Sequence, residues 1–237
     1  MCNEIDARST SRRAMIRNTA AAGLSLPTLG MVSAMAEQPK PASIQNPQEA
    51  LDALMAGNKR FIGGDMLPHD HQSAQRGSSE GQSPFAAFIR CADSRVAPEI
   101  VFDQSFGELF VCGVAGNIPT EEIVASLEYA VAVLHTPLIV IMGHSNCGAV
   151  DAAIKHENSV TDLPGNLPGL ISQILPASIA SADSEDRLNH AIKINVQNGV
   201  KQLPKDSPVI SDAIEAGTCR VVGGVYDLHT GRFTLVD

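Results

Sequence analysis

The sequence of 237 residues has no tryptophan and few basic side chains. Its 17 lysines and arginines are outnumbered by 26 aspartates and glutamates, which gives a formal net charge of -9. Because nucleic-acid binding needs clustered lysine and arginine, this composition excludes a nucleic-acid partner. The hydrophobic content of 44% is enough to build one buried core in a chain of this length. We therefore expect one globular domain rather than a disordered or repetitive chain.

The sequence also lacks a strong candidate for a membrane anchor. Its N-terminal apolar run, residues 19–32, contains Pro27 and is shorter than the roughly 20 residues that a membrane span needs. An arginine pair, Arg12-Arg13, precedes this run, and the small residues Ala34-Met35-Ala36 follow it. That order is typical of a twin-arginine export signal, although a plain N-terminal tail is the alternative.

These features divide the chain into three parts. Residues 1–36 are expected to be a signal peptide that uses the twin-arginine export machinery, residues 37–46 a linker, and residues 47–237 a folded domain with no stable membrane anchor. The protein is accordingly predicted to be exported to a bacterial periplasm.

After residue 46, short apolar segments alternate with helical patterns. Helices are expected at residues 47–58 (with Asn46 as cap), 96–106, 121–134, 149–156 and 189–203, and strands at 84–90, 109–114, 138–142, 219–226 and 232–236. Residues 63–83 are expected to be a surface loop or short irregular helices, and residues 163–169 a loop. Continuous apolar strands separated by helices favour an α/β fold, with a mostly parallel central β-sheet flanked by helices and an N-terminal helical arm.

The cysteines allow several interpretations. Cys2 lies in the predicted signal peptide, which leaves Cys91, Cys112, Cys147 and Cys219. In an exported protein these four are compatible with two disulfides, with one zinc site and two spare thiols, or with buried packing residues. Their spacing alone does not decide between these possibilities.

Two predicted strands run directly into residues that can bind a metal. The first leads into CADSR at 91–95 and the second into GHSNCG at 143–148. Since the carboxyl ends of parallel strands meet at one sheet edge, Cys91, His144 and Cys147 supply the three donors of a catalytic zinc site with a fourth, open position. Gly148, at a helix start, offers a backbone N–H to an anion. The alternatives are a disulfide or buried thiols, with Asp93 and Arg95 as an ordinary ion pair.

CADSR and HSNC resemble the CxDSR and HxxC motifs of the β-carbonic anhydrases. The resemblance continues through GQSP (81–84), GELF (107–110), AGN (115–117) and LEYAV (127–131). It implies reversible hydration of carbon dioxide to bicarbonate and a proton, by attack of zinc-bound hydroxide. One Zn²⁺ per chain would be held by Cys91, His144 and Cys147.

The same resemblance assigns further roles. Asp93 and Arg95 would form the catalytic pair, in which Arg95 keeps Asp93 away from the metal. Gln82, Phe110 and Tyr129 would line the carbon dioxide pocket. The chain would assemble as a homodimer or a higher multiple of dimers, with the zinc near the dimer interface.

The sequence departs from the family pattern at one place. Many β-carbonic anhydrases have an arginine where this chain has Gly113, and in some members this arginine and a tryptophan build a second, inhibitory bicarbonate pocket. Neither side chain is present here, so we expect this form of regulation to be absent. The motifs do not distinguish a carbonyl sulfide or carbon disulfide hydrolase, and a non-catalytic zinc-binding scaffold is the third alternative.

Overall fold

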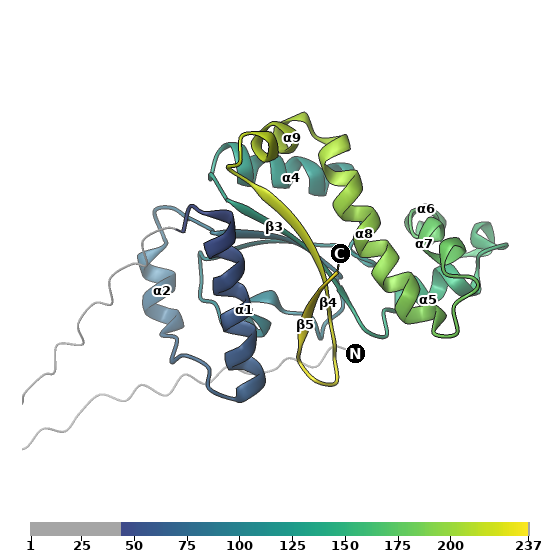
Figure 1. Cartoon of the computed structure of the whole chain (residues 1–237), viewed down its shortest axis with the longest axis horizontal. Helices are drawn as coiled ribbons and strands as arrows, with labels where there is room; N and C mark the ends of the chain where they lie inside the picture. The colour runs from purple at the N-terminus through teal and green to yellow at the C-terminus, as the bar shows by residue number, and fades with distance from the viewer. Residues whose placement is uncertain (1–43, 237) are drawn as a thin grey trace, which may run out of the picture. The chain divides into compact units, whose positions relative to one another are not determined.

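The described residues, 44–236 of this computed structural model, are built around a five-stranded sheet with helices on both faces (Figure 1). The strands are β1 (Ala86–Arg90), β2 (Leu109–Gly113), β3 (Leu138–His144), β4 (Arg220–Tyr226) and β5 (Phe233–Val236). The helices are α1 (Pro47–Gly63), α2 (His71–Gly77), α3 (Pro98–Val101), α4 (Glu121–Ala132), α5 (Gly148–Lys155), η1 (Val160–Asp162), α6 (Leu167–Ser172), α7 (Leu175–Ala180), α8 (Arg187–Asp206) and α9 (Pro208–Glu215). The predicted signal peptide and residues 37–43 of the predicted linker lie outside the described residues.

The strands lie in the order β2-β1-β3-β4-β5. The β1–β2, β1–β3 and β3–β4 pairs are parallel, and only β5 runs antiparallel to its neighbour β4. From β1 the chain first crosses to β2 on one side and later to β3 on the other. The strand order therefore reverses between β1 and β3, where ligands bind in open parallel sheets. The predicted mostly parallel α/β sheet is confirmed.

Alternate side chains of the central strands fill two cores. On one face, Phe88 and Met142 pack with the buried residues of α1 and with Phe102. On the other face, Ile89 and Ile141 pack with α4, α8 and α9. Because both faces are covered, the central strands are apolar throughout, as a parallel sheet requires.

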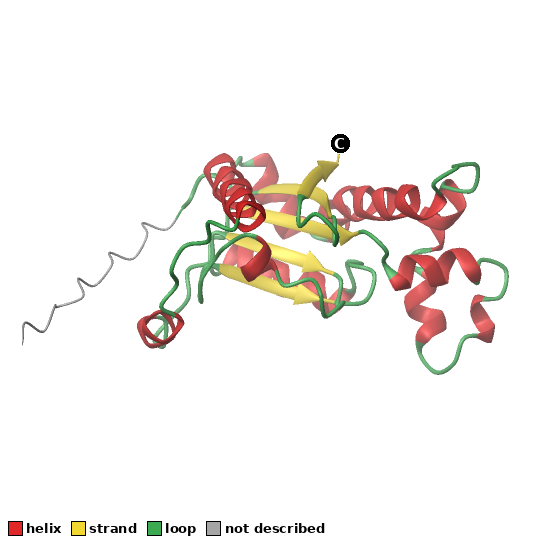
Figure 2. Cartoon of the chain, turned by 90° about the horizontal axis from the view of Figure 1, so that it is seen from below, coloured by secondary structure: helices red, strands yellow, loops and turns green. Residues whose placement is uncertain are grey.

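A helical lobe formed by α5, η1, α6 and α7 lies beyond the carboxyl ends of the parallel strands. Figure 2 shows the strand arrowheads directed toward this lobe. Its apolar side chains, among them Ile171 and Ile174, pack with Cys91 and Cys147 in a third buried cluster. The lobe thus covers one side of the sheet edge at which the two predicted motifs end.

Helix α1 begins at its predicted cap but ends later than expected. The Asn46 side chain accepts hydrogen bonds from the backbone N–H groups of Gln48 and Glu49, at 2.8 and 3.2 Å. The helix then continues through Gly57 to a left-handed cap at Gly64. A Cβ added at Gly57 would lie 1.8 Å from the Phe102 carbonyl oxygen, so this glycine allows a close approach and does not end the helix. The predicted helical arm thus packs on the chain's own sheet.

The expected loop at 163–169 is wrong in its last part, because α6 begins at Leu167. Pro168 stands in the first turn of α6, where a missing N–H costs nothing, and Ile171 buries its side chain in the cluster under the lobe. Helix α9 was not expected. Among the described residues, no helix combines the length and apolarity that crossing a membrane would require.

Candidate metal centre and its surroundings

The three predicted metal ligands meet at the edge where the strand order reverses. Cys91 directly follows β1, His144 is the last residue of β3, and Cys147 is the N-terminal cap of α5. Their donor atoms all lie within 4.8 Å of one another, and all three residues are buried. Two neighbouring parallel strands and the turn into α5 therefore build the cluster, as the sequence predicts.

The sulfur atoms fit a zinc ion better than a disulfide. Cys91 Sγ and Cys147 Sγ are 3.9 Å apart, and both cysteines are free. A disulfide requires about 2.05 Å, whereas two sulfurs bound to one tetrahedral zinc at about 2.3 Å lie about 3.8 Å apart. The disulfide alternative for this pair is thus excluded in the structure described here.

The histidine presents one nitrogen to the two sulfurs. His144 Nδ1 donates a hydrogen bond to the Ser145 carbonyl oxygen at 2.9 Å, which leaves the lone pair on Nε2. Nε2 is buried without a hydrogen-bond partner. A buried nitrogen of this kind is costly unless something binds it, and a metal ion would do so. The donor set and this unpartnered atom together fit zinc.

The hydrogen bond between the two sulfurs moves the pKa values of Cys91 and Cys147 in opposite directions. Their mutual hydrogen bond lowers the pKa of Cys91 to about 4, helped by the backbone N–H of Gly116. The same bond, with burial, raises the pKa of Cys147 well above its ordinary value. At neutral pH the pair therefore holds one thiolate and one thiol, and a divalent cation that bound both sulfurs would release the remaining proton.

Asp93 and Arg95 form a two-pronged ion pair beside the cluster. Arg95 Nε donates to Asp93 Oδ1 at 2.9 Å, and Arg95 Nη2 donates to Oδ2 at 2.7 Å. Asp93 Oδ2 is 3.9 Å from His144 Nε2. Chiefly through its hydrogen bond, the Arg95 side chain holds the pKa of Asp93 far below its usual range. The carboxylate thus stays ionised, close to the unpartnered nitrogen but bound on both oxygens.

The four predicted substrate residues do not gather at the cluster within one chain. Gly148, at the start of α5, directly follows Cys147. Phe110 pairs with Ala87, four residues before Cys91, which places it about 13 Å back along the sheet. Tyr129 is 48% exposed and its ring centroid lies 6.4 Å from that of Phe110. Gln82 is exposed in the loop before β1. Only Gly148 adjoins the ligands of its own chain.

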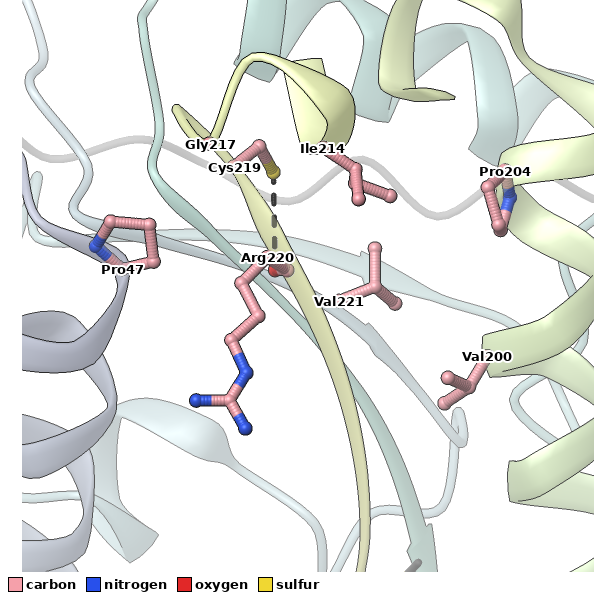
Figure 3. A pocket seen from close by; sticks show the side chains of 8 residues that line it. All are labelled: Pro47, Val200, Pro204, Ile214, Gly217, Cys219, Arg220 and Val221. Carbon is pink, nitrogen blue, oxygen red and sulfur yellow. Dashed lines mark hydrogen bonds between the residues drawn. The ribbon is translucent and has the colours of Figure 1, made fainter. Parts of the chain in front are cut away.

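A hollow of about 430 Å³ lies at the other end of the sheet. Figure 3 shows it at the start of β4, with Cys219 and Arg220 beside Pro47. Its lining is mostly apolar, and none of the cluster residues contributes to it. Arg220 pairs with Leu138, six residues before His144, so the hollow is about 20 Å from the cluster along the strand. It is not part of the candidate metal centre.

Gly113, at the end of β2, is covered by the side chain of Arg90 from the neighbouring strand β1. A Cβ added at Gly113 would lie 3.1 Å from the guanidinium carbon of Arg90. Arg90 Nη1 donates to the Cys91 carbonyl oxygen at 2.8 Å. A side chain from β1 thus occupies the space above Gly113.

Several groups that support the ligands could not be found from the sequence. The Gly116 N–H donates to Cys91 Sγ at 3.3 Å. Ser145 lies between β3 and the β4–β5 turn, since its N–H donates to the Tyr226 carbonyl and its hydroxyl accepts from the Leu228 N–H, each at 2.9 Å. These contacts join residues 25 to 83 positions apart, so the AGN and HSNC motifs contain Gly116 and Ser145 but do not show what these residues contact.

Comparisons with known proteins agree with this arrangement. The carbonic anhydrase family model matches residues 86–233. Carbonic anhydrase 2 of Mycobacterium tuberculosis is 39% identical over 195 residues, which cover 81% of this chain and 94% of that protein. The carbonic anhydrase of Mycolicibacterium smegmatis is 37% identical over 80% of this chain and 93% of its own length. A tetrameric β-carbonic anhydrase of the ascomycete Sordaria macrospora superposes with a TM-score of 0.62 at 26% identity, over 79% of this chain and 96% of that one.

Proposed function

This chain belongs to the β-carbonic anhydrase family and is an enzyme of that class, and we propose that it catalyses the zinc-dependent, reversible hydration of carbon dioxide to bicarbonate and a proton. One observation carries the proposal. Two sulfurs, from Cys91 and Cys147, and one imidazole nitrogen, from His144, converge within 4.8 Å beside a carboxylate that an arginine holds at both oxygens. The three ligands would hold one Zn²⁺ and leave a fourth position open.

Zinc bound there would act as a Lewis acid that lowers the pKa of a coordinated water toward neutrality. Asp93 would accept a hydrogen bond from the attacking oxygen and turn its lone pair toward the carbon of carbon dioxide. Arg95 keeps the Asp93 carboxylate ionised and prevents it from rotating toward His144 Nε2. The Gly148 N–H, at the start of α5, would receive an oxygen of the substrate or of bicarbonate.

We propose that assembly completes the substrate pocket. Gln82, Phe110 and Tyr129 lie far from the ligands of their own chain, and β2 is an edge strand whose outer side is unpaired in the described chain. A homodimer, or a multiple of dimers, that joins the β2 edges would bring such side chains to a partner's metal centre. The similarity to a tetrameric β-carbonic anhydrase supports an oligomer.

The test is stopped-flow carbon dioxide hydration by the purified chain, with zinc content measured on the same sample. We expect fast hydration with about one zinc per chain, and loss of both in Cys147→Ala, because that change removes one of the three metal donors. Ser184→Ala, in the loop between α7 and α8 and outside the set of metal ligands, is the control. Full zinc with negligible hydration at neutral and alkaline pH would refute the proposed reaction, and carbonyl sulfide and carbon disulfide would then be assayed.

We also propose that the protein is exported through the twin-arginine pathway to the periplasm. The order of Arg12-Arg13, an apolar run and Ala34-Met35-Ala36 supports this proposal, although these residues lie outside the described part of the chain. Changing Arg12-Arg13 to Lys-Lys should retain the precursor in the cytoplasm, as measured by cell fractionation. Undiminished periplasmic protein in that variant would contradict the pathway.

A further inference from the structure

A tight turn after β2 directs a backbone N–H at the Cys91 sulfur. Within residues 114–117, the Asn117 N–H donates to the Val114 carbonyl oxygen at 3.1 Å, and Gly116 has φ +79°. A type II turn has this bond and this positive φ at its third residue. The Gly116 N–H then donates to Cys91 Sγ at 3.3 Å. The conformation of the turn therefore decides whether the sulfur receives this hydrogen bond.

The turn has little room to move. A Cβ added at Gly116 would lie 2.4 Å from Ile174 Cδ1 and 3.4 Å from Ala149 Cβ. Ile174 precedes α7 and Ala149 lies in the first turn of α5, so the helical lobe packs against the turn from two elements. Only glycine satisfies both the positive φ and this contact.

One buried polar side chain holds the other end of the Gly116 residue. Asn195 lies in the middle of α8, is 6% exposed, and donates from Nδ2 to the Gly116 carbonyl oxygen at 2.8 Å. Its neighbours on the buried side of α8 are apolar or small: Ala191, Ile192, Val196, Gly199 and Leu203. A buried amide among such residues costs free energy unless it is hydrogen-bonded, and asparagine is a poor helix former. The bond to Gly116 is the compensating contact.

We propose that Asn195 is a positioning residue of the metal centre. Through its bond to the Gly116 carbonyl it fixes the turn, and the turn keeps its N–H on Cys91 Sγ. An N–H bond to a ligand sulfur withdraws electron density from that sulfur, which tunes the metal that the sulfur binds. The inference rests on the proposed zinc site and adds a residue of α8, 79 positions away from Gly116 in the sequence, to the groups that control it.

Asn195→Leu and Asn195→Asp test the proposal, because both keep the approximate size of the side chain, leucine has no polar hydrogen to donate to the carbonyl, and aspartate has none when it is ionised. Metal-free full-length protein is titrated with Co²⁺, and the thiolate-to-metal charge-transfer band is recorded. Zinc affinity is measured by competition with a chromophoric chelator. We expect a shifted charge-transfer band and at least about tenfold weaker zinc binding in both variants, since losing a group that supports a ligand costs 10–100-fold.

Two control variants on the same helix separate positioning from simple destabilisation. Asn198→Leu changes an exposed asparagine, and Leu203→Ala removes a buried side chain of the cluster that packs against α4 and α9. Leu203→Ala should unfold at lower urea concentration than wild type, yet both controls should keep the wild-type Co²⁺ spectrum and zinc affinity.

Asn195→Leu with a wild-type spectrum and wild-type zinc affinity would overturn the inference and leave the proposed function intact. A spectral shift in Leu203→Ala equal to that in Asn195→Leu would overturn it as well, because loss of stability would then explain the effect. A wild-type chain that bound neither Co²⁺ nor Zn²⁺ would refute the proposed function together with the inference.

Discussion

At the scale of single residues, the pair of Asp93 and Arg95 should decide whether the metal centre has an open position. Arg95 binds both oxygens of Asp93, and Asp93 Oδ2 is already 3.9 Å from His144 Nε2. We predict that Arg95→Ala lowers the rate of carbon dioxide hydration about 10²-fold or more while zinc content stays near one per chain. The freed carboxylate can rotate to the open position, and the attacking oxygen loses its oriented acceptor. Stopped-flow rates and metal analysis of the same sample measure both quantities.

The control for this prediction is Arg76→Ala, which removes an exposed arginine in the last turn of α2. Arg76→Ala should keep the wild-type rate, because it removes one positive charge from the protein but leaves the ion pair of Asp93 and Arg95 intact. A wild-type rate in Arg95→Ala would show that hydration does not require Arg95 to hold the Asp93 carboxylate in place.

A second buried carboxylate, Asp103, should contribute to stability in a pH-dependent way. Its side chain is fully buried and is contacted by Arg60 Nε, by His69 Nε2 at 2.9 Å and by the Leu67 N–H at 3.2 Å. Burial alone would raise the pKa of Asp103, but the bonds from Arg60, His69 and Leu67 outweigh it and lower the pKa below the usual 3.8. A depressed folded-state pKa stabilises the fold above the unfolded-state value, and this contribution is lost as pH falls through the folded-state value.

Asp103→Asn should therefore lower the free energy of unfolding by about 2 kcal/mol at pH 7, because buried donors lose their charged acceptor. The difference from wild type should shrink as the pH is lowered from 5 toward 3. Urea unfolding across this range is the measurement, with the exposed Asp183→Asn as control. A difference that stays constant with pH would mean that the Asp103 charge is not involved.

The residue-scale predictions from the sequence succeeded where a chemical group directly follows an apolar strand. Cys91 and His144 could be predicted as metal ligands for this reason, and the parallel pairing of β1 with β3 brings them together. The role of Asn195 could not be predicted, because an asparagine inside a helical pattern is indistinguishable from an exposed polar residue until its hydrogen-bond partner is known. The same holds for Arg60, whose partner Asp103 is 43 residues away.

At the scale of elements, Gly57 shows why helix ends are harder to predict than helix starts. The start of α1 depends on a local contact between Asn46 and the next few residues. Its continuation past Gly57 depends on a distant one, because the Asn58 side chain donates to the carbonyls of Val101 and Gly231 at 3.1 and 2.9 Å. A glycine in the pattern predicted an end only because these contacts do not appear in the sequence.

We predict that Gly57→Ala destabilises the protein by about 1–3 kcal/mol or more, since its methyl group would lie 1.8 Å from the Phe102 carbonyl oxygen and α1 would have to shift away from α3. The matched control is Gly77→Ala in α2, where a Cβ meets no atom within 4 Å. That variant should be neutral or slightly stabilising, because alanine restricts the unfolded chain. The midpoint of urea unfolding distinguishes the two, and equal midpoints would show that Gly57 is not tightly packed.

At the scale of the whole molecule, the topology follows from burial. The apolar strands β1 and β3 required cover on both faces, which α1 supplies on one face and α4, α8 and α9 supply on the other. What the sequence of one chain does not specify is which surface meets another chain, because an exposed apolar side chain looks the same in the sequence as a buried one. Tyr129 and Val133, both on the α4 side next to the edge strand β2, are 48% and 55% exposed.

These exposed side chains lead to a prediction about assembly. If chains associate through β2 and α4, Val133→Glu should convert oligomers to monomers and reduce carbon dioxide hydration per chain, because a charge buried at an interface is costly and the substrate residues of the partner would be lost. Light scattering coupled to size exclusion measures the mass, and stopped-flow measures the rate.

Ile179→Glu is the matched control, since Ile179 is 59% exposed on α7, away from β2. This variant should keep the wild-type mass and the wild-type rate. Monomers of Val133→Glu with full activity would show that one chain carries a complete site. Dissociation in Ile179→Glu instead would move the interface to the helical lobe.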